Sequence, residues 1–136
     1  MGDENYFIPF GKATSVRTGS DAAIISYGYS LVTAQKAAQA LEAEGISVEI
    51  IDLRTLYPLD TETINKTVQK YGRVVVLDEA PVFGSFTAEI ASTATEVNYG
   101  SLKGPIVRVG GVRAPISANP AMADAAIQPL PQSCLR

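Results

Sequence analysis

Two carboxylates, Asp78 and Glu79, directly follow a continuous apolar run at residues 74–77. Such groups could act as a general base or hold a cation. Adjacent residues of a strand point to opposite faces, so the pair is not expected to share a proton. The structural alternative is that one carboxylate accepts backbone N–H bonds while the other meets Arg54 or a partner subunit. We favour this alternative, because ion pairs that only stabilise the fold can resemble the charged groups of a functional site.

Two further candidates are Ser30 and Arg54, which lie in the segments GYS (28–30) and DLRTLYPLD (52–60). Ser30 stands at a strand-to-helix turn, as a helix N-cap, where helix N–H groups could bind an anion. No glycine-rich phosphate motif accompanies it, so a structural turn is the simpler interpretation. Arg54 could clamp a carboxylate or phosphate, or brace its loop by pairing with Asp52. The residue pattern leaves these two roles of Arg54 open.

The sequence contains no histidine and a single cysteine, Cys134. Serine triads, Cys–His dyads and histidine-based zinc sites are therefore excluded together. One cysteine also excludes an internal disulfide and a cysteine-based metal site, and it fits a reducing compartment. Any chemistry would rest on carboxylate, lysine, tyrosine or serine side chains, or on a cofactor.

The bulk properties exclude several classes of partner. The 136 residues fit one domain, and the net charge of −3 gives no basic excess for nucleic acid or an anionic membrane. No apolar run approaches the roughly 20 residues of a membrane span. The N-terminal MGDEN is acidic where a signal peptide would be basic. We therefore expect neither nucleic acid nor a membrane as a partner.

Hydrophobic periodicity predicts strands and helices in alternation. Strands are expected at 12–17, 22–27, 48–52, 74–77 and 106–109, and helices at 30–44, 61–71, 86–97 and 120–127. The first two strands are expected to form a hairpin around the turn TGSD at 18–21. This order predicts an α/β fold of three layers, α/β/α. Its mostly parallel sheet has about five strands, one of them an antiparallel edge strand.

Residues 1–11 are predicted to form an N-terminal arm, and residues 12–136 the domain itself. The arm carries the large apolar side chains of Tyr6, Phe7, Ile8 and Phe10. Such side chains need a surface to cover, on this domain or on a neighbour. We therefore expect self-association or partner binding through the arm.

Several motifs in order resemble the beta subunits of the thiamine diphosphate-dependent 2-oxo acid dehydrogenases. The run DLRTLYPLD (52–60) looks like their DLRTL-P-D run, and FIPFGKA (7–13) resembles the P-GKA start of their last domain. SYG (26–28) and the alanine-rich segment after it also fit. DEAP (78–81), GSF (84–86) and AEI (88–90) match their (H/D)EAP, GGF and AEI. The resemblance extends from about Tyr6 to Pro129.

The resemblance implies a transketolase C-terminal type of domain that builds subunit interfaces. The whole enzyme decarboxylates a 2-oxo acid such as pyruvate and acylates a lipoyl group, with thiamine diphosphate and magnesium bound by other domains. The implied partners are an alpha subunit, a second beta subunit and, in some members, the dihydrolipoyl acyltransferase core. The implied location is the cytoplasm, or the mitochondrial matrix in a eukaryote. This chain alone is expected to bind no cofactor and to be inactive. Its candidate interface or anion-contact residues are Ser30, Arg54, Asp78, Glu79, Phe83 and Phe86.

Three positions depart from the family pattern: Ser85 replaces a glycine, Asp78 stands where many members have histidine, and the chain ends without a further helix. Two alternatives therefore stay open. One is a free-standing α/β module that binds a small anion through Ser30 and Arg54. The other is the C-terminal domain of a transketolase-type enzyme. A flavodoxin-like phosphoacceptor fits less well, because Tyr27 and Gly28 stand where that fold needs acids.

Overall fold

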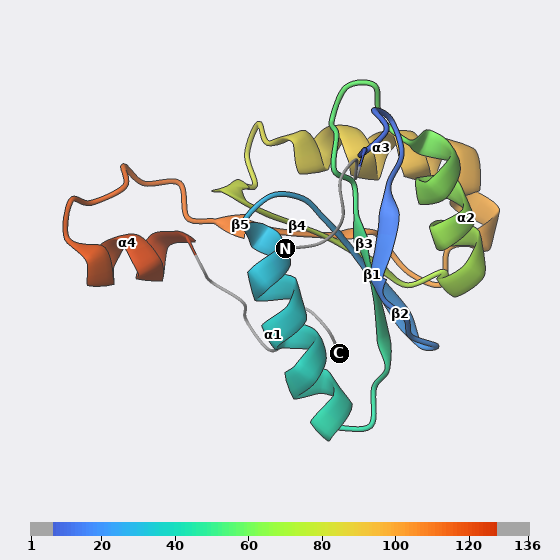
Figure 1. The fold of residues 1–136 in the computed structure, drawn as a ribbon, viewed down its shortest axis with the longest axis horizontal. Helices are drawn as coiled ribbons and strands as arrows, with labels where there is room; N and C mark the ends of the chain where they lie inside the picture. The colour runs from blue at the N-terminus through green and yellow to red at the C-terminus, as the bar shows by residue number, and fades with distance from the viewer. Residues whose placement is uncertain (1–6, 128–136) are drawn as a thin grey trace.

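The computed structural model describes residues 7–127, which form one sheet flanked by helices (Figure 1). The strands are β1 (Thr14–Arg17), β2 (Ala22–Ser26), β3 (Val48–Asp52), β4 (Val74–Pro81) and β5 (Val107–Gly111). The helices are α1 (Ser30–Ala43), α2 (Thr61–Tyr71), α3 (Phe86–Asn98), the short 3₁₀ helix η1 (Tyr99–Ser101) and α4 (Pro120–Ile127). The expected alternation of strands and helices is confirmed.

The five strands of the sheet lie in the order β1-β3-β2-β4-β5. Strand β1 is antiparallel to β3, and all other neighbours are parallel. The fold class is thus confirmed: an α/β domain whose mostly parallel sheet has one antiparallel strand, at its edge. The working loops after β2, β3, β4 and β5 therefore gather at one end of the sheet, as in other open α/β folds.

The predicted hairpin between the first two strands is wrong. Strand β1 pairs with β3 instead of β2, and β2 lies inside the sheet between β3 and β4. The connecting turn crosses the start of β3, where the N–H groups of Ser20 and Asp21 both donate to the Ser47 carbonyl. Gly19 makes this crossing possible, because a Cβ there would lie 2.2 Å from the Val48 carbonyl carbon. Short turns favour hairpins, but here the close approach of the turn to the start of β3 lets β1 pair with β3.

The core consists of two apolar layers on opposite faces of the sheet. Ile24, Ile50 and Val75 face α1, where the small side chains of Ala34 and Ala38 let the helix approach closely. The residues next to them in the strands face α2 and α3 instead; they include Ala23, Ile25, Ile51, Val74 and Val76. Both sheet faces are therefore covered, which explains the continuous apolar runs of the central strands.

Helix α2 is held by a well-formed cap at each end. The Asp60 carboxylate accepts the backbone N–H of Thr63 at 3.0 Å, and Gly72 ends the helix in the left-handed conformation with φ of 67°. The same carboxylate accepts the N–H of Ala13 at 2.9 Å, so it also holds the residue before β1. Asp60 thus caps α2 and joins the start of the domain to this helix.

Helix α4 stands away from the rest of the described molecule, on a loop that follows β5 (Figure 1). Its predicted start is confirmed, because Asn119 Oδ1 accepts the N–H of Ala121 at 3.0 Å. The N–H of Val112 bonds to the carbonyl of Ala126 and ties the far end of the helix to the end of β5. Among the described residues, no helix combines the length and apolar character needed to span a membrane.

Candidate functional site

Asp78 lies inside β4, because this strand runs on to Pro81 instead of ending at Leu77. Its side chain is buried, accepts the Tyr27 hydroxyl hydrogen at 2.6 Å and accepts the N–H of Glu79 at 2.7 Å. Burial first, and then the hydrogen bond and charge of Asp78, raise the pKa of Tyr27 well above its usual range. Both Asp78 oxygens thus have donors, so the carboxylate holds the end of β4 in place, as the structural alternative expects.

Glu79 is exposed, whereas Asp78 is buried. The two carboxylates therefore have different surroundings and do not form a dyad that shares one proton. Both line a pocket of about 400 Å³ beneath the loop that leads to α4, together with apolar groups such as Pro81, Val112 and Ile116.

Ser30 is the first residue of α1, and Tyr29 occupies the N-cap position. The prediction that Ser30 caps the helix is wrong: its Oγ is buried and makes no hydrogen bond within the described residues. The N–H groups of Leu31 and Val32 already donate to the carbonyls of Gly28 and Tyr29. An anion would have to compete with these bonds, so the geometry lends the anion-binding hypothesis little support.

We expect Ser30→Ala to leave the free energy of unfolding unchanged or to raise it by up to about 1 kcal/mol, because it removes a buried hydroxyl that lacks a partner. Loss of a true capping serine would instead cost about 1 kcal/mol. Urea denaturation of both chains measures the difference. Asp60→Ala, which removes a cap that does form, is the matched control, and a clear loss of stability in Ser30→Ala would contradict the geometry.

Arg54 lies in the loop after β3 with a left-handed backbone, at φ of 58°. Asp52 Oδ1 accepts the backbone N–H of Arg54 at 2.9 Å, so Asp52 braces the loop through the main chain. Further along, Thr55 Oγ1 accepts the N–H of Gly11 and donates to the carbonyl of Pro58, which follows a cis peptide bond. The loop is thus tied to the root of the N-terminal arm.

Tyr27 was not singled out by sequence reasoning, yet it connects two of the predicted site residues. Its hydroxyl bonds to Asp78, and its ring meets Phe86 edge-on with 6.5 Å between the ring centroids. Phe83 lies apart from this cluster: its ring is exposed, and the Arg113 guanidinium stacks over it at 4.3 Å. The signal for Tyr27 was its place at the end of a buried strand, one residue before a glycine.

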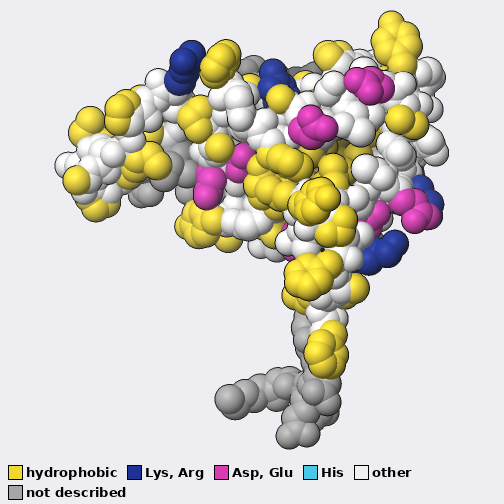
Figure 2. All heavy atoms as spheres, turned by 90° about the horizontal axis from the view of Figure 1, so that it is seen from above, with side chains coloured by type: hydrophobic (Ala, Val, Ile, Leu, Met, Phe, Trp, Pro, Cys, Tyr) yellow, Lys and Arg dark blue, Asp and Glu magenta, His cyan; other side chains and the backbone are white. Residues whose placement is uncertain are grey.

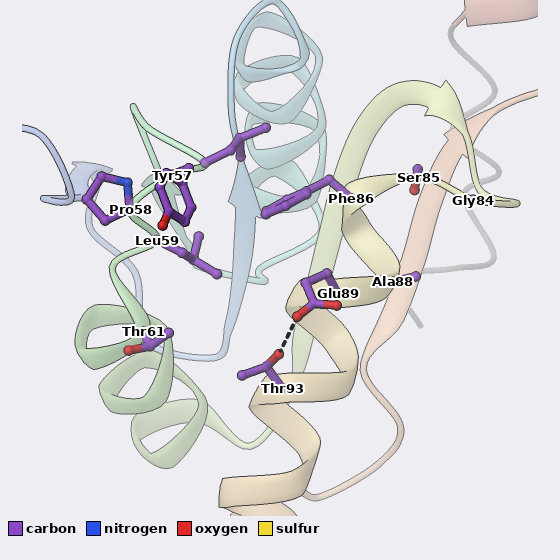
Figure 3. A pocket seen from close by; sticks show the side chains of 11 residues that line it. Tyr57, Pro58, Leu59, Thr61, Gly84, Ser85, Phe86, Ala88, Glu89 and Thr93 are labelled. Atoms are coloured by element: carbon purple, nitrogen blue, oxygen red, sulfur yellow. Dashed lines mark hydrogen bonds between the residues drawn. The ribbon is translucent and has the colours of Figure 1, made fainter.

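A groove of about 980 Å³ lies between the loop after β3 and the start of α3 (Figure 3). The lining residues of this groove, named the α3 groove from here on, are Leu56, Tyr57, Pro58, Leu59, Thr61, Gly84, Ser85, Phe86, Ala88, Glu89 and Thr93. In Figure 3 the Tyr57 and Phe86 rings face one another across its upper part. Apolar side chains dominate, so the groove suits an apolar segment better than a small anion.

The described residues do not offer a metal centre. They contain no group of three or more histidine, cysteine, aspartate or glutamate side chains that could hold a metal ion. The resemblance assigns thiamine diphosphate and magnesium to other domains, and no chemical step is assigned to the described residues.

Comparison with known proteins identifies the family of this chain. A family model described as the C-terminal domain of transketolase matches residues 11–134. The chain belongs to this family. The resemblance noted in the motifs is thereby confirmed, and the matched region begins at Gly11.

Curated relatives of this transketolase C-terminal domain are beta subunits. The chain is 42% identical over 113 residues to the 2-oxoisovalerate dehydrogenase subunit beta 2, mitochondrial, of Arabidopsis thaliana. It is 42% identical over 118 residues to the pyruvate dehydrogenase E1 component subunit beta of Rhizobium meliloti. It is 40% identical over 119 residues to the acetoin:2,6-dichlorophenolindophenol oxidoreductase subunit beta of Cupriavidus necator. These matches cover 83%, 85% and 88% of the chain.

The transketolase C-terminal domain spans only about a third of these relatives, at 32%, 26% and 35% of their lengths. Among solved structures, a chain described as a split gene transketolase, inactive beta4 tetramer, matches with a TM-score of 0.69 and 26% identity. That match covers 95% of this chain and 45% of the other. A 2-oxoglutarate:ferredoxin oxidoreductase from Magnetococcus marinus shares the fold alone, with a TM-score of 0.50 and 17% identity.

Proposed function

We propose that this transketolase C-terminal domain is the assembly domain of the beta subunit of a thiamine diphosphate-dependent 2-oxo acid dehydrogenase. The observation that carries the proposal is the identity of 40–42% to the three dehydrogenase and oxidoreductase beta subunits, over more than four fifths of the chain. In the whole enzyme, decarboxylation and acyl transfer to lipoyl would take place in other domains, which bind thiamine diphosphate and magnesium.

The geometry of the candidate residues supports an assembly role. The Asp78 carboxylate accepts hydrogen bonds from the Tyr27 hydroxyl and from a backbone N–H. The N–H groups of Leu31 and Val32, in the first turn of α1, already donate to backbone carbonyls. Side chains that serve the fold in this way are not available for chemistry. What the described surface does offer is exposed apolar side chains, among them Phe7 and Phe10 of the arm, Tyr57 in the loop after β3, and Phe83.

Such exposed apolar surfaces mark sites of protein association. The proposed partners are an alpha subunit and a second beta subunit, with the dihydrolipoyl acyltransferase core as a third in complexes that use this domain for docking. The split gene transketolase chain, described as a beta4 tetramer, supports association between copies of a related chain. The proposed location is the cytoplasm, or the mitochondrial matrix in a eukaryote, as for the mitochondrial relative.

A domain exchange tests the proposal. We expect the Rhizobium meliloti beta subunit to keep at least about a tenth of its 2-oxo acid dehydrogenase activity when this chain replaces its matching segment, because an interface domain contributes no reacting group. The measurement is turnover after assembly with the alpha subunit of that enzyme. The same beta subunit cut at the exchange point is the control and should be inactive. An exchanged subunit that folds and pairs with alpha but has no activity would overturn the proposal.

Substrate preference provides a second readout of the same exchange. A hybrid built on the pyruvate-type subunit should keep preferring pyruvate, and one built on a 2-oxoisovalerate-type subunit should keep preferring the branched acid. The isolated chain, given thiamine diphosphate and magnesium, is expected to decarboxylate neither. A hybrid whose preference moves to a new 2-oxo acid would place specificity in this domain and contradict the proposal.

The alternative of a small-anion module is favoured by one observation, the buried and unpartnered Ser30 Oγ at the start of α1. Calorimetric titration of the chain with phosphate and with pyruvate separates the two functions. An assembly domain should show no heat of binding at millimolar anion. Saturable binding that Ser30→Ala and Arg54→Ala both abolish would favour the anion module instead.

A further inference from the structure

The described part of the N-terminal arm, residues 7–10, carries large apolar side chains that are exposed in the part of the chain that the structure describes. Phe7 is 82% exposed, Phe10 is 83% exposed and Ile8 is half exposed. In Figure 2 the arm stands off the body of the molecule, at the bottom of the view, with hydrophobic side chains along it. Phe7 and Phe10 are almost fully exposed to water, and burial of their rings against a partner would be favourable.

The α3 groove lies directly beside the root of the arm. The N–H of Gly11 donates to Thr55 Oγ1 at 2.9 Å, and a Cβ on Gly11 would lie 3.0 Å from the Pro58 ring. Pro58 is itself a wall of the groove. Gly11 adopts a positive φ of 68°. The arm and the groove are thus adjacent parts of one surface, and the arm leaves its own groove open.

We propose that two copies of this chain associate by exchanging arms, each arm lying in the α3 groove of the other copy. A surface that carries a projecting apolar segment next to an apolar recess is self-complementary under a two-fold axis. The proposal rests on the proposed function, because it gives the assembly domain one partner, a second copy, and one surface.

The area available matches a stable dimer. An aromatic side chain buries about 150–250 Å², so one arm would bury about 400 Å², with a similar area of groove beneath it. Two arm–groove contacts then remove about 1,600 Å² from water, which is the usual size of a specific protein interface. Aromatic anchors in a recess are the typical centres of binding energy.

Sedimentation equilibrium of the 136-residue chain over a concentration series tests the exchange. The chain is expected to form dimers, and Phe7→Ser with Phe10→Ser should raise the dimer dissociation constant at least about 100-fold. Both side chains are exposed in the monomer, so their replacement should leave its unfolding midpoint unchanged. Val97→Ser with Tyr99→Ser, which changes two exposed residues at the far end of α3, is the matched control and should keep the dimer.

A mixed cross-link tests the arrangement itself. In a Cys134→Ser background, one chain carries Phe10→Cys and a differently tagged chain carries Ala88→Cys, on the α3 wall of the groove. Oxidation of the mixture should join the two kinds of chain, whereas Phe10→Cys mixed with Val97→Cys should not.

A monomeric chain would overturn the inference, as would a dimer that is insensitive to the arm substitutions or that fails to form the mixed cross-link. This failure is distinct from failure of the proposed function. An active domain-exchange hybrid combined with a monomeric isolated chain refutes arm exchange alone. An inactive hybrid combined with an arm-dependent dimer refutes the proposed function and leaves arm exchange standing.

Discussion

Gly19→Ala is expected to lower the free energy of unfolding by about 3 kcal/mol, at the upper end of the usual cost of overpacking. The added methyl would lie 2.2 Å from the Val48 carbonyl carbon and 2.3 Å from the Glu49 nitrogen. These are backbone atoms of a central strand, so they cannot turn aside as a flexible side chain could. Urea denaturation, followed by circular dichroism, measures the loss.

Gly100→Ala is the matched control, because a Cβ at Gly100 meets nothing within 4 Å and its φ is not positive. That variant should differ from the parent by less than about 0.5 kcal/mol. The comparison also tests the topology. In a hairpin between β1 and β2, Gly19 would lie in a solvent-exposed turn and tolerate alanine, so equal stability of the two variants would argue against the crossing over β3.

The second large effect is expected at Asp60. Asp60→Ala should lower the free energy of unfolding by about 3 kcal/mol, since it removes the cap of α2 and leaves the N–H of Ala13 without an acceptor. The buried carboxylate serves both groups, with distances of 3.0 Å to the Thr63 nitrogen and 2.9 Å to the Ala13 nitrogen. The measurement is the unfolding free energy at pH 7. Asp60→Asn is the matched variant: its amide oxygen can still cap α2, so it should lose less than Asp60→Ala.

The stability that Asp60 contributes should depend on pH. Burial acts to raise its pKa, but the hydrogen bonds from Thr63 and Ala13, with the charge of Lys12, together hold the pKa below the ordinary value of 3.8. A carboxyl group with a lowered pKa in the folded state contributes fully above its unfolded pKa, and this contribution is lost as pH falls through the folded pKa. The stability difference between the parent chain and Asp60→Asn should therefore be constant from pH 7 to about pH 5 and shrink below about pH 4. A stability difference that grows on acidification would show that the pKa of Asp60 is raised by folding and not lowered.

The two proposals ask different questions about this chain. The domain exchange asks whether this chain can complete a 2-oxo acid dehydrogenase, and the arm exchange asks how two copies meet. The arm exchange depends on apolar side chains of the arm and of the loop after β3, which the fold leaves in solvent. If the dimer forms, burial at its interface explains why Phe7 and Phe10 are exposed in the isolated chain.

The sequence by itself determined the fold class and the family. Continuous apolar strands such as 74–77, alternating with amphipathic helices, can be buried only in a mostly parallel sheet covered on both faces. Asp60 as a helix cap and Asn119 before Pro120 follow from local hydrogen bonding within a few residues, so they could be predicted. The family motifs are local as well, because DLRTLYPLD and DEAP are read from neighbouring letters.

Only the tertiary structure decided what depends on contacts between distant residues. Strand order is one such feature: β1 pairs with β3 because Gly19 allows the turn to pass over the backbone of Val48, 29 positions further along the chain. The roles of the site residues are another. Asp78 is held by Tyr27, and the Ser30 hydroxyl is buried without a partner among the described residues, neither of which spacing along the chain reveals. The sequence marked Asp78 and Glu79 as noteworthy. The packing around them gave Asp78 a structural role, and it placed the surface available to partners at the arm and the α3 groove.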